Sequence, residues 1–266
     1  MFEIFAVYLT VGAVAGVLAG LFGIGGGLVI VPMLVLCFTW QGVDGSIMMQ
    51  LALGTSLASI VFTAVSSFMA HHRRGAVAWD VVRRICLGIL VGTYAGTFVA
   101  AVLPTRVLKV VFVVFLFFVC WQMLSGKRPK PTRQMPGLAG MSLAGVIIGA
   151  ISSLVGIGGG TLSVPFMVWH NIPLHRAIGT ASAIGFPIAV AGTIGYVVHG
   201  LGVPGRPEWC LGFISLPALL GIILASVCTA PLGVRLAHAL PVDRLKKIFA
   251  VLLLVVGLRM LWSVVA

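Results

Sequence analysis

Two glycine clusters constrain the fold of this chain more than any other feature of its sequence. Residues 23–27 read GIGGG and continue to Pro32, and residues 156–160 read GIGGG and continue to Pro165. Both clusters interrupt long apolar runs, although glycine inside a helix costs about 1 kcal/mol relative to alanine. The second cluster follows the first by half the length of the 266-residue chain. The pattern predicts two repeats, each built around one interrupted helix.

The composition indicates that those apolar runs lie in a membrane. Hydrophobic residues make up 60% of the chain, charged residues 8%, and the mean hydropathy is +1.19, whereas a typical soluble domain carries about 25% charged residues. The formal net charge of +12 comes from basic residues in short loops, which is typical of membrane topology rather than of nucleic-acid binding. We therefore predict an all-α integral membrane protein with lipid as a partner and no nucleic acid.

Further matches support the duplication. The segment LGTS at 53–56 resembles IGTAS at 178–182, and LP at 103–104 resembles LP at 240–241. We predict a first membrane repeat at 1–126, a basic cytoplasmic linker at 127–136, and a second membrane repeat at 137–266. In the first apolar run, the spacing of Gly12, Gly16 and Gly20 is typical of tight helix packing in membranes.

The path of the chain at each glycine cluster decides the topology. If the chain passes straight through, each repeat crosses four times, the repeats are parallel, and the basic residues divide ten against seven. If it turns back as a re-entrant hairpin, each repeat crosses three times and the repeats are inverted. Only four of the seventeen basic residues then lie on one side: Arg106, Lys109, Arg206 and Arg259. Because basic residues accumulate in cytoplasmic loops, the charge favours inverted repeats with both termini extracytoplasmic. Against this, run 4–22 is long enough to span a bilayer unaided.

The glycine clusters are also the candidate site. Gly23 and Gly156, with Pro32 and Pro165, mark the structural breaks. A helix that restarts after a break presents unpaired N–H groups and about half a positive charge, and irregular backbone is tolerated at membrane depth where it lines a cavity. Two such ends that face each other would bind an anion. The N–H donors would come from Gly25, Gly26, Gly27, Gly158, Gly159 and Gly160. The alternative is that these glycines only allow close packing.

Hydroxyl groups follow each cluster at matching places. Thr55 and Ser56 in the first repeat, and Thr180 and Ser182 in the second, are candidate neutral donors to the anion. The alternative is that these side chains bond back to carbonyls of their own helices, as Ser and Thr commonly do.

Several kinds of chemistry find no support in the sequence. All five acidic residues fall at the ends of apolar runs or in loops, which argues against a carboxylate proton relay. There is no GxxxxGK[ST] nucleotide loop and no Ser/His/Asp, Cys/His or HExxH constellation. Neither the cysteines nor the histidines have metal-ligand spacing, and we expect the histidines at the membrane interfaces. We predict no enzyme, no cofactor and no metal.

At the segments GLFGIGGGLVIVP and SLVGIGGGTLSVP, and at the GTS and GTAS that follow them, the chain resembles the TauE/SafE sulfite exporter family. This family is also called the toluene-sulfonate uptake permeases. The resemblance covers essentially the whole chain. It implies a multi-pass transporter of sulfite, sulfonates or related sulfur-containing anions in the bacterial plasma (inner) membrane.

Together, the residues and the resemblance predict potential-driven export of a small oxyanion through a midplane site between the repeats. A cell interior at negative potential expels anions at about 2.3 kcal/mol per charge per 100 mV. One alternative is cation-coupled import of an organic or sulfur anion. Another is a non-transporting membrane subunit of a larger complex.

Overall fold

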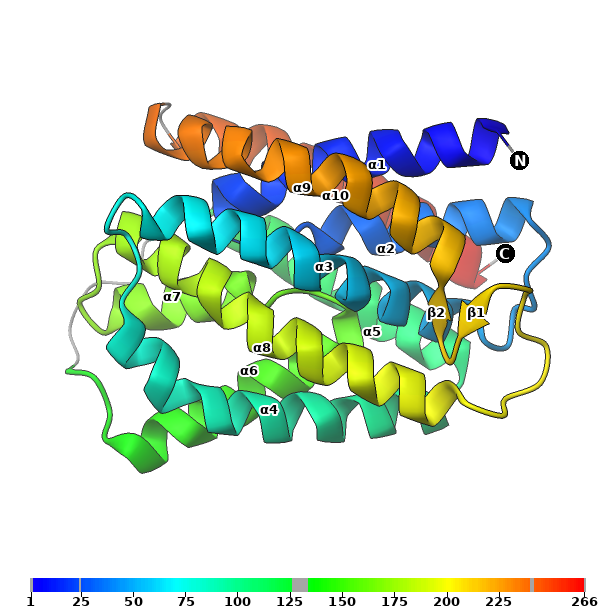
Figure 1. Ribbon diagram of the computed structural model, residues 1–266, viewed down its shortest axis with the longest axis horizontal. Coiled ribbons are helices and arrows are strands. Elements are labelled where there is room, and N and C mark those ends of the chain that lie inside the picture. Colours follow the sequence, from blue (N-terminus) through cyan, green and yellow to red (C-terminus); the bar gives the residue numbers. More distant parts are fainter. Residues whose placement is uncertain (1, 24, 126–133, 240–241, 266) are drawn as a thin grey trace.

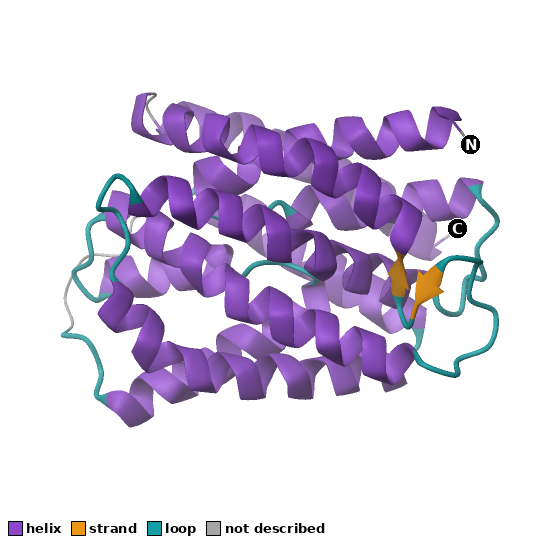
Figure 2. Cartoon of the chain, viewed as in Figure 1, coloured by secondary structure: helices purple, strands orange, loops and turns teal. Residues whose placement is uncertain are grey.

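The computed structural model describes residues 2–23, 25–125, 134–239 and 242–265. These residues form ten helices and one pair of two-residue strands (Figures 1 and 2). The helices of the first half are α1 (Phe2–Phe22), α2 (Gly27–Trp40), α3 (Met48–His72), α4 (Trp79–Val102) and α5 (Thr105–Leu124). Those of the second half are α6 (Leu138–Val155), α7 (Gly160–Trp169), α8 (Leu174–Gly200), α9 (Leu216–Ala239) and α10 (Val242–Val265). The predicted all-helical fold is confirmed.

Helix length separates two classes of element. Seven helices in the described residues are long and apolar enough to cross a membrane: α1, α3, α4, α5, α6, α8 and α9. The helices that follow the glycine clusters are short, because α2 has 14 residues and α7 has 10, whereas a full crossing needs about 20. Pro32 and Pro165 lie inside these two short helices rather than at their ends. The long helices make this a multi-pass membrane protein.

The chain reverses direction between α1 and α2. Gln41, which follows the last residue of α2, donates a hydrogen bond from Nε2 to the hydroxyl of Tyr8 near the start of α1, at 2.6 Å. The two helices therefore run antiparallel. Figure 1 shows both chain termini at the same end of the molecule as the loop between α2 and α3.

Helix packing follows one scheme in both halves. Helix α1 packs against α9 and α4 packs against α6, while α3 packs against α8 and α5 against α10. Helix α3 also contacts α9, as α8 contacts α4. Exchanging each helix for the one five places away in the chain converts α1–α9 into α6–α4 and α3–α9 into α8–α4, and it leaves α3–α8 and α5–α10 unchanged. The two halves therefore use the same packing scheme.

Glycine rows bring the outer pairs of helices into backbone contact. A Cβ added to Gly16 would lie 2.7 Å from the Cα of Ser226 on α9, and Gly12 and Gly20 face the same helix. In the other half, Gly92 on α4 meets Val146 on α6 in the same way. Small residues let membrane helices approach closely, so the packing role predicted for Gly12, Gly16 and Gly20 is confirmed.

One element was not expected from the sequence. Strands β1 (Cys210–Leu211) and β2 (Ile214–Ser215) pair antiparallel just before α9, and Gly212 provides the positive φ of 56° in the turn between them. Elsewhere, residues 127–133 of the predicted linker 127–136 lie outside the described residues.

Candidate functional site

The first glycine cluster forms a tight turn between α1 and α2. Gly25 and Gly26 have φ values of 77° and 80°, a region that residues with a Cβ rarely adopt. Gly26 is the N-cap of α2, and no side chain caps that helix. The first N–H groups of α2 therefore have no side-chain capping partner.

The second cluster forms a similar turn, although Gly158, which corresponds to Gly25, has no positive φ. Gly156, with φ of 71°, ends α6, and Gly159, with φ of 73°, is the N-cap of α7, again without a side-chain cap. The N–H of Ile157 donates to the carbonyl of Ser152 at 3.0 Å and closes the end of α6. Figure 2 shows this segment as a loop inside the helical body, far from the loops at the two ends.

The two turns lie against each other, backbone to backbone. A Cβ added to Gly25 would lie 3.3 Å from both the N and the Cα of Gly158, and one added to Gly27 would clash with the carbonyl oxygen of Gly156. Side chains larger than hydrogen would therefore push the turns apart. The structure brings together the starts of α2 and α7, whose positive dipole ends come from opposite halves of the chain.

Ser56 stabilises the place where the two glycine turns meet, which we call the crossing of the glycine turns. Its hydroxyl donates to the carbonyl oxygen of Gly156 at 2.8 Å, and the side chain is fully buried in α3. Ser56 thus contacts the second glycine turn from the first repeat. The contact is to a carbonyl, so the hydroxyl supports the turn in this conformation.

Thr55 and Thr180 hold main-chain groups that lead into helices. The Thr55 hydroxyl accepts the N–H of Ser215, just before α9, at 2.9 Å. The Thr180 hydroxyl accepts the N–H of Ala78, just before α4, at 2.9 Å and donates to the carbonyl of Arg176 at 2.6 Å. The structure does not bring these two hydroxyls to the glycine crossing.

A narrow cavity adjoins the first glycine turn. It has no room for a water molecule, and it is lined by Ala19, Gly23, Gly25, Ala64, Ser67, Ser182 and Gly185. Ser182 was predicted from the sequence, and its hydroxyl donates to Ile178 O at 3.2 Å. Ser67 was missed, and it donates to the Ser182 hydroxyl at 3.2 Å. This conformation is closed around its polar groups.

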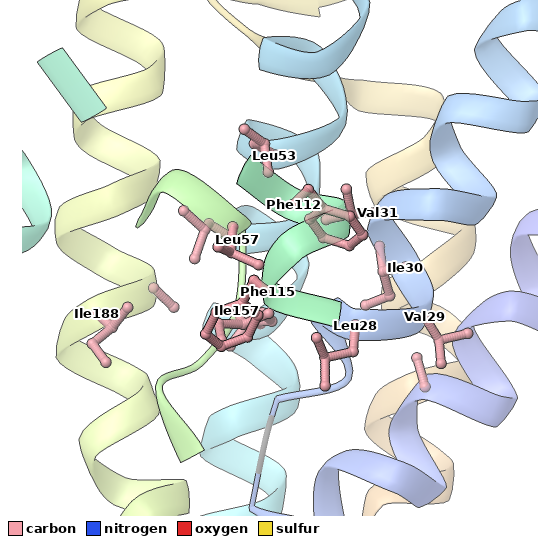
Figure 3. Close-up of a cluster of buried hydrophobic side chains, with 14 of the residues drawn as sticks. Leu28, Val29, Ile30, Val31, Leu53, Leu57, Phe112, Phe115, Ile157 and Ile188 are labelled. Carbon is pink, nitrogen blue, oxygen red and sulfur yellow. The ribbon is translucent and has the colours of Figure 1, made fainter. Parts of the chain in front are cut away.

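Apolar side chains surround the crossing. Figure 3 shows Leu28 and Val31 of α2, Leu57 of α3 and Phe115 of α5 gathered around Ile157 of the second turn. Each of these side chains is less than one-tenth exposed. In such surroundings, hydrogen bonds and dipoles act more strongly than in water, and an unpaired polar group is costly.

Sequence reasoning also missed one pair of buried contacts. His71 on α3, only 1% exposed, lies with Nε2 3.0 Å from the carbonyl oxygen of Gly20 on α1. Tyr196 on α8 donates from its hydroxyl to the carbonyl oxygen of Ser153 on α6 at 2.9 Å. The same helix pair is thus bridged in both halves, by different side chains. His71 is the next-to-last residue of α3, so it lies at the end of a helix long enough to span the membrane, and α1 covers its side chain.

The described residues contain no cluster of side chains that could bind a metal ion. No three His, Cys, Asp or Glu side chains come together there in a way that could hold an ion. The cysteines in the described residues are unpaired thiols at Cys37, Cys86, Cys120, Cys210 and Cys228.

Comparisons with known proteins agree with this architecture. The family described as sulfite exporter TauE/SafE matches residues 8–260. A probable membrane transporter protein of Haemophilus influenzae is 40% identical over 262 residues, which cover 98% of this chain and 99% of that protein. One of Methanocaldococcus jannaschii is 28% identical over 95% of this chain and 94% of its own. No solved structure matches the chain. The chain therefore belongs to the TauE/SafE family and is a membrane transporter.

Proposed function

We propose that this transporter moves small sulfur-containing oxyanions, sulfite or organosulfonates, across the bacterial plasma membrane. The observation that carries the proposal is the contact between Gly25 and Gly158, which brings the starts of α2 and α7 together in the interior. Helix N-termini bind anions through their free N–H groups. The donors would be Gly25, Gly26 and Gly27 with Gly158, Gly159 and Gly160. Ser182, which lines the adjoining cavity, would add a hydroxyl.

We infer that the two halves are inverted repeats, each with a re-entrant hairpin at its glycine turn. The antiparallel course of α1 and α2 supports the hairpin, as does the position of the N-terminus at the same end as the loop between α2 and α3 (Figure 1). The shared packing scheme supports the duplication. The loop between α2 and α3 would then be extracytoplasmic. Its Asp44 accepts the N–H of Ser46 at 2.9 Å, which holds the pKa of that carboxyl below its usual range. Residues 41–47 of this loop contain no Lys or Arg, which suits an outer loop, since basic residues mark the cytoplasmic side.

Export driven by the membrane potential follows from the charges. A negative interior expels an anion at about 2.3 kcal/mol per charge per 100 mV. The acidic residues stand in loops or in the first turns of helices: Glu3, Asp44, Asp80, Glu208 and Asp243. An electrogenic exporter needs no buried carboxylate to couple its transport to protons.

Cation-coupled import is the second candidate, and one observation favours it. His71 is a buried titratable side chain one helical turn after Ser67, which lines the cavity. Its exposed neighbours His72, Arg73 and Arg74 mark the adjacent end of the molecule. A proton bound at His71 would supply the co-transported cation that import against the potential requires.

Reconstitution in liposomes tests the proposal. Vesicles loaded with sulfite are given an inside-negative potential with valinomycin and a potassium gradient, and efflux is compared with that of sulfate and taurine. We expect sulfite efflux that rises with the imposed potential and is absent from protein-free vesicles. Sulfite uptake that needs an inward proton gradient would instead establish the importer. Folded, inserted protein that carries none of these anions would contradict the proposal and favour a non-transporting subunit.

A further inference from the structure

Three buried hydroxyl groups flank the second glycine turn without a hydrogen-bond partner in the described residues. They belong to Ser152 in the last turn of α6 and to Thr161 and Ser163 at the start of α7. The side chains are 0%, 6% and 0% exposed. The buried hydroxyls of Ser56 and Ser59 are bonded, whereas that of Thr93, which packs against Gly149 of α6, also has no partner in the described residues. Buried polar groups without a partner are rare in native proteins, and each one calls for an explanation.

These hydroxyls lie where main-chain donors are also free of helical partners. Ser152 Oγ lies 3.3 Å from the position of a Cβ added to Gly159, the N-cap of α7. The first hydrogen bonds of α7 run from the N–H groups of Leu162 and Ser163 to the carbonyl of Gly159, at 3.1 and 2.9 Å. The N–H groups of Gly160 and Thr161 come before these bonds, so they have no partner within the helix. The free amide donors at the start of α7 therefore lie close to the unpartnered hydroxyl of Ser152.

The first repeat has no such hydroxyls. When the two GIGGG segments are aligned, Ser152 corresponds to Ala19, Thr161 to Leu28, and Ser163 to Ile30. All three of those residues are apolar and buried. The two turns share a positive-φ glycine at the N-cap of the helix that follows, Gly26 before α2 and Gly159 before α7. Among the described residues, the unpartnered hydroxyls that flank a glycine turn belong to the second half, which points to a ligand that is held asymmetrically.

We propose that the transported oxyanion binds on the second-repeat side of the crossing, to the hydroxyls of Ser152, Thr161 and Ser163 and the N-terminus of α7. This inference rests on the proposed function and names the side chains that recognise the substrate. The ligand class is an anion with an SO₃ group, which sulfite and sulfonates share. Neutral hydroxyl and amide donors satisfy such a group without a buried cation, and hydrogen bonds to a charged acceptor are stronger than those between neutral groups.

Thermal melting of the purified protein in detergent, with and without sodium sulfite, tests this proposal. The test variants are Ser152→Ala, Thr161→Val and Ser163→Ala. The matched control is Ser153→Ala, because Ser153 is also fully buried but its hydroxyl is bonded to Ala150 O at 2.9 Å. Sodium methanesulfonate serves as a second ligand. Apparent Kd values come from the sulfite dependence of the melting temperature.

The expected results differ between test and control variants. Without an anion, the test variants should melt at or above the temperature of the wild type, because the change removes a buried hydroxyl that has no partner. With sulfite, each should bind about tenfold or more weakly, since a hydrogen bond to a charged group is lost. The control should bind within about twofold of the wild type. Thr161→Ser keeps the hydroxyl and should also bind like the wild type, even if Thr161→Val fails to fold.

Two outcomes would overturn the proposal, and they are distinguishable. If sulfite stabilises the wild type and all three test variants equally, the hydroxyls are satisfied by buried water and only this inference fails. If neither sulfite nor methanesulfonate stabilises the wild type, the proposed function fails together with it.

Discussion

The contact between the two glycine turns makes Gly27→Ala the sharpest test of the packing. A Cβ at this position would lie 3.0 Å from the Cα of Ile157, besides clashing with the carbonyl oxygen of Gly156. Carbon atoms in ordinary contact are about 3.5–4.0 Å apart, so the turns must separate by roughly 0.5–1 Å. Gly27 lies in a helix without a positive φ, so the substitution tests steric contact without adding backbone strain.

The energetic effect combines a cost and a gain. Overpacking of a well-packed interior costs typically 1–3 kcal/mol, while alanine in place of glycine in a helix gains up to about 1 kcal/mol. We expect a net loss of roughly 1–2 kcal/mol in the free energy of unfolding, or a melting temperature lower by roughly 2–8 °C. Sulfite flux in liposomes should fall as well, because the added methyl group pushes apart the two turns that hold the proposed N–H donors.

Gly45→Ala is the control for this experiment. Gly45 stands in the loop between α2 and α3, has no positive φ, and a Cβ there meets nothing within 4 Å. Its melting temperature should equal that of the wild type. If Gly27→Ala melts and transports like Gly45→Ala, the turns are not in contact in the membrane and the reasoning is refuted.

Three further predictions follow from the same contacts. Ser56→Ala leaves the buried carbonyl of Gly156 without its donor and should lower the free energy of unfolding by about 1–3 kcal/mol, measured by thermal melting; an unchanged melting temperature would mean that another donor replaces it. Thr55→Val and Thr180→Val each orphan a backbone N–H and should destabilise by a similar amount, whereas Thr55→Ser and Thr180→Ser should restore the wild-type melting temperature. Gly185→Ala places a Cβ 3.0 Å from the carbonyl oxygen of Gly158 beside the cavity and should slow sulfite flux severalfold, and flux equal to that of the wild type would exclude this cavity from the pathway.

The sequence predicted the elements that depend on local chemistry. Every long apolar run became a helix, and the helices after the glycine clusters begin at Gly27 and Gly160, within the predicted stretches. The helix breaks could be predicted at Gly26 and Gly159 because both residues have a positive φ, a conformation that only glycine occupies readily. The GIGGG repeat therefore carried real information about backbone geometry.

The orientation of polar side chains could not be predicted in the same way. Thr55 and Ser56 are adjacent in α3, yet one holds Ser215 ahead of α9 and the other holds Gly156 in the second turn. Which neighbour each hydroxyl meets depends on how helices from different halves of the chain pack. Ser67 and His71 were missed for this reason, because nothing in the local sequence indicates that α8 or α1 covers them.

The most direct test of the central claim is a structure with the anion bound. Selenite, in which selenium replaces the sulfur of sulfite, provides an anomalous signal that locates the ligand in a crystal of the transporter. The account predicts one anomalous peak at the crossing of the glycine turns, within hydrogen-bonding distance of the N–H groups at the start of α7. A peak confined to the basic loops, or an empty crossing at selenite concentrations that stabilise the protein, would contradict it.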